Sequence, residues 1–483
     1  MKPNALYALY AAVSIFLAGC AAVGPNYHAP VTSDPKNWSE APAGGVTSAP
    51  MQVGEWWKTF NDPELESLIE RAVKANYDLR LAEARLMEAR ANRSHAKWDF
   101  APTVGTSASY TKQQTSGNLS TNSKANTSTV SQVYDTGFDA TWEIDVFGSK
   151  RRSLEEASAN YGASEENRRD TLITVLGDVA RNYVEVRAAQ NRLAIAHENI
   201  DSQKKTIELT RARFNAHLTS ELDVRQAEAL LASTEATIPQ FETTLKQSIH
   251  ALGVLLGQPP GALLAELSKD EPIPTTPPTV PIGLPSELLR RRPDIRSAER
   301  QLAAATADIG VQTAELFPKF SLVGTAGLQS VRASDWFTAG SGYWSAGPSI
   351  TWRVLDFGRI QSEINAADAR QQQALDTYEQ TVLTAFQNVE DSLVAYTNEQ
   401  THYTALNDAV IANQRALELS QALYQEGVGD FLNVLDAERS LFAAQDQLAD
   451  SRRAETEDLV SLYKALGGGW EAPQFAESTA AAR

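Results

Sequence analysis

Cys20, the only cysteine in the 483-residue chain, is the residue whose surroundings point most directly to a chemical reaction. It ends the segment Leu-Ala-Gly-Cys at residues 17–20, which follows a short apolar run and a lysine at position 2. This is the pattern of a bacterial lipoprotein signal, in which the cysteine is cut free and lipidated. The next residue is Ala21 rather than aspartate, which favours the outer membrane as the destination. The alternative is a stray cysteine beside an ordinary signal-peptide cleavage site.

Patterns that would support catalysis or metal binding are absent from the sequence. It contains no Gly-x-Ser-x-Gly, His-Glu-x-x-His or phosphate-binding loop, and its six histidines are not clustered. His197 has no second histidine, cysteine or acid at ligand spacing, so we expect it to be solvated. The sequence therefore predicts no enzyme, no cofactor and no metal site, and a single cysteine leaves no disulfide.

The composition limits the class of protein further. The net charge of −17 argues against a nucleic-acid partner. After the N-terminus, no apolar run approaches the roughly 20 residues that a membrane-spanning helix needs. We therefore expect a folded protein with a large water-exposed surface.

The elements that carry the remaining candidate residues come from an internal duplication. Trp142, Phe147 and Gly148 recur 210 positions later, and matches at this offset continue to residue 466. An offset of 216 relates the preceding stretch, where Pro102 recurs as Pro318. A period this long differs from that of short-repeat solenoids. It indicates that the protein is built from two near-equivalent halves.

Each half contains two strands that we expect to cross a membrane. Residues 134–146 and 344–354 alternate apolar and polar side chains, which indicates strands with one apolar face. Partner strands begin after Pro102 and Pro318, and each strand has about 10 residues, the length of a tilted membrane-crossing strand. Four strands cannot close a barrel, which needs roughly eight, and open edges are not tolerated in lipid. The count therefore predicts that several chains share one barrel.

The longest helices are expected at residues 148–215 and 358–426, where proline is absent. At about 1.5 Å per residue, each would be on the order of 100 Å long. Apolar residues recur every seven positions in both segments, which predicts coiled-coil packing. The position four residues further on changes from apolar to polar at Gln190 and Gln400. We interpret the change as a more water-exposed distal part of each helix.

The rest of the chain divides into shorter helices and linking segments. Helices are expected at residues 63–97, 220–257, 286–314 and 430–467, and the proline-rich residues between the halves indicate a connector. The predicted organisation is a signal peptide (1–19), an acylated N-terminal segment (20–62), a first repeat (63–257), a connector (258–285), a second repeat (286–467) and a C-terminal tail (468–483). The fold class is thus mainly α with membrane β-strands.

These features together resemble the TolC-like outer-membrane efflux proteins, in particular the lipoprotein members that serve drug pumps. The similarity covers essentially the whole mature chain and rests on motifs that are specific only jointly: Cys20, Gly24-Pro25-Asn26-Tyr27, Trp56-Trp57, Phe60, Asp62-Pro63, Asn76, Leu79, Ala82, Arg85, Arg292-Pro293-Asp294-Ile295 and Leu316-Phe317-Pro318. The resemblance implies a homotrimer with a 12-stranded β-barrel in the outer membrane and a 12-helix coiled-coil α-barrel in the periplasm. Residues 21–62, 258–285 and the C-terminal tail would form a belt around the middle of the helical part.

The function that this resemblance implies is a passive exit duct. An inner-membrane RND-type pump would load drugs and other small compounds, and a periplasmic adaptor (membrane fusion) protein would bridge the pump to the duct. The implied partners are therefore two further copies of the chain, the adaptor, the pump and outer-membrane lipid, with no nucleic acid.

The resemblance also implies a gate beside the two helical turns. Asp223 matches a gate aspartate, Tyr424 the gate tyrosine and Asp436 an aspartate that rings the narrowest point. Two departures, Gly429 in place of an arginine and Asn433 in place of a second ring aspartate, predict a thinner network of bonds at this gate. The implied adaptor contacts are the turn residues Asn215, Ala216, His217, Leu218, Thr219, Ser220, Gly427, Val428, Gly429 and Asp430. Without the resemblance, these acids would be ordinary solvated helix ends, with Asp430 capping the helix that follows.

Other classes of protein explain only part of the sequence. A non-conducting periplasmic coiled-coil scaffold lipoprotein would account for the heptads and Cys20 but not for the four amphipathic strands. A free-standing diffusion porin would account for the strands but not for helices of this length. An exit duct of a type I protein secretion system remains the nearest alternative, because the same fold would serve it.

Overall fold

The computed structural model describes residues 22–31, 35, 37–39, 45–47, 49, 53–116, 129–277 and 279–471. The predicted signal peptide, Cys20 and most of the C-terminal tail lie outside the described residues. The chain forms two compact units, and each takes segments from both repeats. Unit 1 comprises Met1–Pro30, Met87–Ala163 and Ala298–Tyr378, and unit 2 comprises Val31–Leu86, Ser164–Ser297 and Glu379–Arg483.

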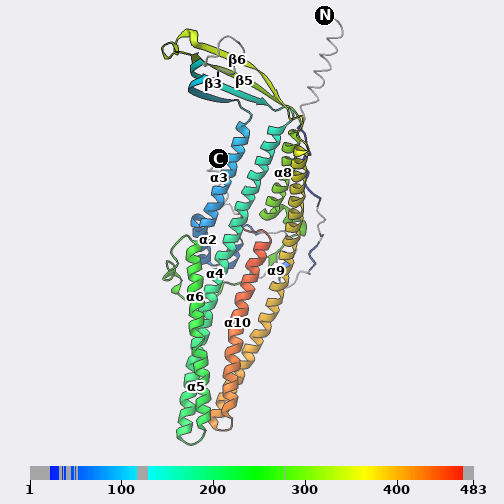
Figure 1. Ribbon diagram of the computed structural model, residues 1–483. Helices are drawn as coiled ribbons and strands as arrows, with labels where there is room; N and C mark the ends of the chain where they lie inside the picture. The colour runs from blue at the N-terminus through cyan, green and yellow to red at the C-terminus, as the bar shows by residue number, and fades with distance from the viewer. Residues whose placement is uncertain are drawn as a thin grey trace. The chain divides into compact units, whose positions relative to one another are not determined.

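Unit 1 contains one four-stranded antiparallel sheet whose strand order is β2-β3-β5-β6. The four strands lie side by side in Figure 1, and they confirm the strands expected from the alternating pattern. Among the described residues, each of the two outer strands has one edge without a partner strand. The bounds are Thr103–Thr115 for β2, Thr129–Ile144 for β3, Lys319–Ser330 for β5 and Gly342–Thr351 for β6, with the short 3-10 helices η4 (Ala333–Asp335) and η5 (Ala339–Ser341) between the last two.

Apolar and aromatic side chains remain exposed on this sheet. Phe138 and Ile350 are each 64% exposed within the single chain. Near one end, the Tyr134 ring lies 4.8 Å from that of Tyr110 and 5.4 Å from that of Trp336. Near the other end of the sheet are the repeat-equivalent Trp142 and Trp352. Their indoles donate to the carbonyls of residues 100 and 316, at 2.9 and 3.0 Å. Exposed apolar strands with aromatic residues towards both ends are the surface expected of a membrane-crossing sheet.

The two long helices are present as predicted. α4 spans Ser149–Asn215 and α9 spans Arg359–Glu426, 67 and 68 residues respectively. Each begins after a repeat-equivalent glycine, Gly148 or Gly358, whose φ of 88° turns the chain from the sheet into the helix. Among the described residues, no helix combines the length and the apolarity needed to cross a membrane.

Three of the four shorter helices are interrupted, contrary to the prediction of continuous ones. Residues 63–97 form α2 (Pro63–Ala75) and α3 (Tyr77–Trp98), because the extended Asn76 accepts the first amides of α3 with its side chain, at 2.8 and 3.1 Å. The equivalent Arg292 separates α7 (Pro285–Arg291) from α8 (Pro293–Ala314), since a residue before proline disfavours the helical conformation. Two residues separate α5 (Glu221–Glu235) from α6 (Ile238–Leu255), and the second residue of α6 is a proline. The fourth helix, α10 (Phe431–Ala465), is continuous.

The core of unit 2 forms along the predicted seven-residue seam. Val179, Val186, Val389 and Tyr396 on this seam are fully buried. An aromatic cluster joins this core to the N-terminal segment, where η1 (Trp56–Phe60) stacks its first tryptophan on Tyr463 at a ring distance of 5.4 Å. The Trp-Trp motif of the sequence is thus part of the core.

The connector between the repeats packs onto α4 and changes one sequence-based interpretation. Gln190, expected at the start of a water-exposed stretch, is buried and its side chain donates to the carbonyls of Leu267 and Lys269 at 2.8 and 3.3 Å. The connector covers it with the short helix η3 (Glu266–Ser268). A further link is the parallel pairing of β1 (Val46–Thr47) with β4 (Val280–Pro281), which joins the N-terminal segment to the connector.

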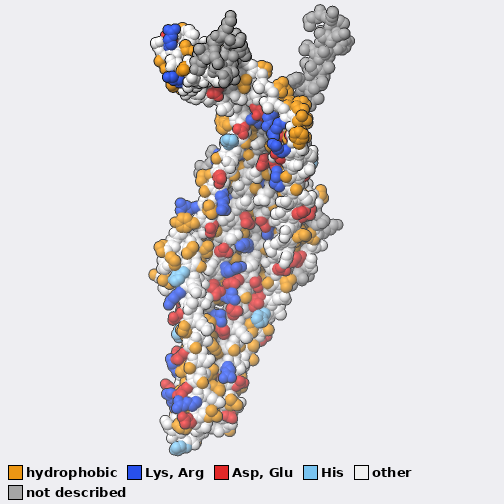
Figure 2. All heavy atoms as spheres, in the orientation of Figure 1, with side chains coloured by type: hydrophobic (Ala, Val, Ile, Leu, Met, Phe, Trp, Pro, Cys, Tyr) orange, Lys and Arg blue, Asp and Glu red, His pale blue; other side chains and the backbone are white. Residues whose placement is uncertain are grey.

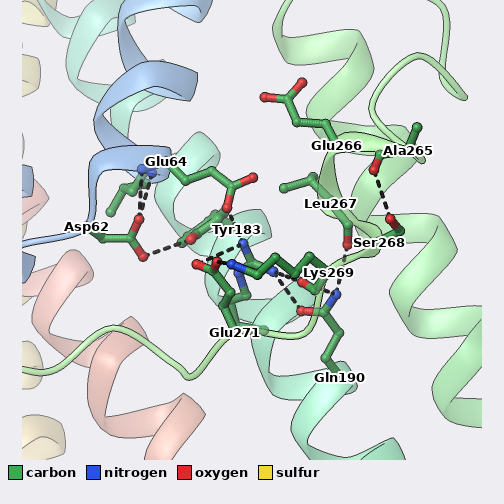
Figure 3. A network of polar contacts seen from close by, with 12 residues as sticks. Asp62, Glu64, Tyr183, Gln190, Ala265, Glu266, Leu267, Ser268, Lys269 and Glu271 are labelled. Carbon is green, nitrogen blue, oxygen red and sulfur yellow. Dashed lines mark hydrogen bonds and ion pairs between the residues drawn. The ribbon is translucent and has the colours of Figure 1, made fainter.

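Arg187 is the centre of this connection. Figure 3 labels its partners Glu64, Gln190 and Lys269. Its guanidinium is fully buried, is paired with Glu64 of α2, and donates to Gln190 and to the Lys269 carbonyl, each at 2.8 Å. It also lies 4.9 Å from the centre of the Tyr183 ring. One arginine therefore fixes α2 and the connector to α4.

Replacement of Arg187 by methionine is expected to destabilise unit 2 by about 2–4 kcal/mol, because it leaves Glu64 and the connector carbonyl without their partner. The matched control is Arg71→Ala, which removes the more exposed pair between α2 and Glu266 of the connector, 2.6 Å apart, and should cost less than about 1 kcal/mol. Thermal unfolding followed by tryptophan fluorescence measures both. Equal midpoints for the two variants would contradict the prediction.

The helical surface is solvated rather than strongly patterned by charge. On the face seen in Figure 2, acidic and basic side chains are interspersed among apolar ones over the helices. Charged side chains along the helices also form pairs within one turn, such as Arg225 with Glu221 and Arg453 with Glu457. The net negative charge is therefore not gathered into one patch on this face.

Candidate functional site

The two helical turns identified in the sequence have the same backbone geometry. The first (215–220) and the second (427–430) each close with an amide that donates back to the preceding helix, at 2.9 and 3.1 Å. His217 and Gly427 take the equivalent left-handed position, with φ of 58° and 79°. Both turns belong to unit 2, and Figure 1 shows them together at one end of it. The duplication has therefore produced two matching hairpins.

Acidic side chains cap the helices that leave these turns. Asp223 and Ser220 form a reciprocal capping box, and the Thr219 hydroxyl donates to the same Asp223 carboxylate. At the second turn, the Asp430 carboxylate accepts the Leu432 amide at 3.2 Å and caps α10. Both carboxylates are thus engaged at the start of their own helices.

Tyr424, the residue that matches the gate tyrosine, lies in the core between the hairpins. It is 3% exposed, and its ring packs 5.5 Å from that of Phe431. Among the described residues its hydroxyl has no hydrogen-bond partner, so no bond joins it to Asp223. The guanidinium of Arg213, at the end of α4, instead lies 4.6 Å from the centre of the Tyr424 ring.

Asn433 and Asp436 lie on α10 and are exposed within the chain. Side chains three residues apart project from the same face of a helix. The two residues therefore present one polar surface close to the second turn.

A buried carboxylate beside this site was not singled out by the sequence. Glu438 is 3% exposed and accepts a hydrogen bond from the Thr206 hydroxyl of α4, and burial raises its pKa. Its repeat equivalent, Glu228, pairs with Arg211 and Arg225, which lower its pKa. The two positions carry the same residue, but the arginines that pair with Glu228 have Gln421 and Leu435 as their repeat equivalents. The packing of α10 against α4 places Glu438 against Thr206 instead.

Replacement of Glu438 by glutamine is expected to raise stability near neutral pH by about 1 kcal/mol, since the neutral amide can keep the bond to Thr206. The pKa of the Glu438 carboxyl is raised above the ordinary 4.5 in the folded protein, so folding favours its protonated form. The folded state is therefore more stable at low pH and loses this stability as the pH increases through the raised pKa. The gap between the thermal midpoints of variant and wild type should therefore widen from pH 4.5 to pH 8. Glu228→Gln is the control and should lower the midpoint near neutral pH. A gap for Glu438→Gln that is independent of pH would contradict the prediction.

Comparison with known proteins decides the family. The model of the family described as "Outer membrane efflux protein" matches residues 68–258 and 284–468, one match for each repeat. The chain belongs to the outer membrane efflux protein family. Its members and structural neighbours named below are transport proteins or channels.

Relatives of this family align over nearly the full length. The chain is 34% identical to the antibiotic efflux pump outer membrane protein ArpC of Pseudomonas putida, over 95% of each chain. It is 33% identical to the cation efflux system protein CusC of Escherichia coli, over 95% of this chain and 98% of the other. The solved structure of the outer-membrane channel OprN superposes with a TM-score of 0.88 at 36% identity, covering 93% of this chain and 99% of that one.

Family membership fixes the fold, the location and the broad function. The protein is an outer-membrane efflux channel that combines a helical barrel with a β-barrel, as its structural neighbours do. It is the outer-membrane component of an efflux pump. The TolC-like resemblance and the outer-membrane location expected from the sequence are confirmed.

Proposed function

We propose that three copies of the chain form one passive exit duct. The main support is the four-stranded antiparallel sheet with exposed apolar side chains, whose two edges have no partner strand within the described part of the chain. With an even number of strands, β6 of one copy runs antiparallel to β2 of the next. Three copies then give 12 strands, which closes a barrel and leaves no edge in lipid. The two long helices and their shorter partners supply the 12-helix tunnel.

The duct receives its substrates from other proteins. An inner-membrane RND-type pump loads drugs and other small compounds, and a periplasmic adaptor contacts the turns at 215–220 and 427–430. Support comes from relatives named as an antibiotic efflux pump protein and a cation efflux system protein. Acylation of Cys20 anchors the mature chain to the outer membrane.

The gate of the duct lies beside the same turns. Asp223, Tyr424, Asn433 and Asp436 are the gate residues, with Asp436 of three copies ringing the narrowest point. The support is their position next to the turns and the burial of Tyr424 between the two hairpins.

Detergent-extracted full-length protein tests this function. It should sediment as a trimer and form channels in a planar lipid bilayer, and photo-crosslinkers at residues 216 and 428 should capture the adaptor protein in cells. A monomer, or a trimer without conductance, would indicate a scaffold. Capture of a protein-secretion adaptor in place of a drug-pump adaptor would indicate type I secretion.

A further inference from the structure

Arg213 joins the two hairpins of unit 2 at their turns. The residue lies in the last turn of α4, and its Nη1 donates to the Tyr424 carbonyl at 2.9 Å and more weakly to that of Gln425 at 3.5 Å. Its guanidinium lies 4.6 Å from the centre of the Tyr424 ring. One side chain of the first hairpin therefore binds both the backbone and the ring at the end of α9.

The chemistry of this contact favours a firm attachment. The last carbonyls of a helix have no partner within the helix and carry the negative end of its dipole, so they attract a cation. A guanidinium is always charged and its flat face stacks on aromatic rings. Tyr424 is almost fully buried, so its ring is shielded from water on the other side. A Cβ at Gly427 would be in ordinary contact with Nη2, at 3.7 Å, so the guanidinium lies directly against the second turn.

The pair exists once in each chain although the hairpins are duplicated. The repeat equivalent of Arg213 is Leu423, and that of Tyr424 is Phe214. A leucine and a phenylalanine can form neither the charged hydrogen bond nor the cation–π contact. The contact between Arg213 and Tyr424 is thus specific to the place where the end of α4 meets the end of α9 within one chain.

Within the chain, the side chains matched to the family's gate residues are engaged elsewhere or lack a hydrogen-bond partner among the described residues. The Asp223 carboxylate is held by Thr219 and the Ser220 amide, and the Tyr424 hydroxyl is unbonded among the described residues. A side chain at Gly429 would be tightly packed, because a Cβ there would lie 3.0 Å from the Leu423 Cβ and 3.1 Å from the Tyr424 nitrogen.

We propose that Arg213 is the latch of the periplasmic gate, holding the end of α9 against the end of α4 when the duct is closed. It is a positioning residue that acts on Tyr424 through the ring face and the carbonyl, and the tyrosine hydroxyl contributes little. The inference rests on the proposed function, namely a duct that conducts and is gated at these turns. Opening then requires the last turn of α9 to leave the guanidinium.

Single-channel recordings of the full-length protein in planar bilayers test the latch. Arg213→Ala should raise the fraction of time spent open about tenfold, the effect of losing a partly buried cation–π contact together with a charged hydrogen bond. The matched control is Arg211→Ala, two residues away, which removes an exposed pair with Glu228 inside the first hairpin and should leave the open fraction unchanged. Arg213→Lys keeps the positive charge but loses the planar guanidinium group, and it should give an intermediate open fraction.

Tyr424→Phe separates this latch from one built on the tyrosine hydroxyl. A latch on the ring face predicts a much smaller increase for Tyr424→Phe than for Arg213→Ala, and the reverse order would overturn the proposal. Trimer yield is measured on the same samples, and if the alanine variant does not assemble, the lysine variant decides. An open fraction equal to wild type in the assembled Arg213 variant would also overturn it. A wild-type trimer that never conducts would instead contradict the proposed function.

Discussion

Replacement of Gly327 by valine is expected to abolish assembly of the β-sheet and with it stable insertion into the outer membrane. Gly327 of β5 lies directly opposite Gly137 of β3. A Cβ at position 327 would lie 2.4 Å from the Thr136 carbonyl oxygen and 2.8 Å from the Gly137 Cα. Both are backbone atoms of the central strand pair and cannot move aside, so we expect a cost on the order of 5 kcal/mol.

An aromatic side chain explains why the glycine pair does not weaken the sheet. The Tyr343 ring covers both glycines, with Cε1 3.0 Å from the Cβ position of residue 327 and the hydroxyl 3.1 Å from that of residue 137. A ring lying over a glycine in a neighbouring strand replaces the missing side-chain packing. Valine at 327 would displace this ring in addition to striking the backbone.

The control for Gly327→Val lies on the same strand. A Cβ at Gly324 would meet only the Ser345 carbonyl oxygen, at an ordinary contact distance of 3.7 Å. Gly324→Val should therefore assemble, whereas Gly327→Val should yield no trimer in outer-membrane fractions examined by sedimentation and immunoblotting. Similar trimer yields for the two variants would show that the sheet is not held as described.

The parts of the fold that the sequence predicted are those in which a local pattern repeats many times. The long proline-free segments predicted the bounds of α4 and α9 to within one residue. The seven-residue seam predicted the side of each helix that is buried, because a coiled coil buries the same positions in every heptad. Alternation over more than ten residues located β3, and the duplication repeated each signal in the second half. A pattern that repeats many times still identifies the helix or strand when one or two of its positions carry an unexpected residue.

The interruptions of the shorter helices depend on single residues and were missed. Asn76 breaks a helix because its side chain accepts the first amides of α3 and its amide nitrogen donates to the Leu255 carbonyl at 2.9 Å. That carbonyl is 179 residues away, so no local pattern indicates the break. Gln190 was misjudged for a similar reason, because the connector that buries it lies almost 80 residues further along the chain.

At the candidate site, residue types were predictable but their partners were not. The resemblance drew attention to Asp223 and Tyr424, yet the tyrosine is bound by Arg213, which no motif singled out. Glu228 and Glu438 are the same residue at equivalent positions, but Glu228 pairs with Arg211 and Arg225, which the second repeat replaces by Gln421 and Leu435. Glu438 is a buried acid because α10 packs it against α4. Which side chains contact each other at the hairpin ends depends on how the folded helices pack.

Neutralising Asp436 is expected to remove most of the cation preference of the duct. In the proposed trimer, three Asp436 carboxylates surround one axis near the second turn, and such a ring attracts cations and repels anions. Asp436→Asn keeps the size of the side chain, so the cation-to-anion permeability ratio should fall at least about threefold with little change in conductance at high salt. Asp436→Ala also shortens the side chain and should increase conductance. Reversal potentials under a salt gradient and single-channel conductance measure the two effects separately.

The salt dependence provides an internal check on the role of Asp436. At about 1 M salt the Debye length is roughly 3 Å, so wild type and Asp436→Asn should converge, whereas near 0.1 M it is about 10 Å and the difference should be largest. Glu418→Gln is the control, because this exposed acid of α9 is already paired with Arg415 at 2.8 Å and lies away from the turn. If Asp436→Asn and Glu418→Gln shift the reversal potential equally, the preference comes from the overall negative charge, and Asp436 does not line the narrowest point.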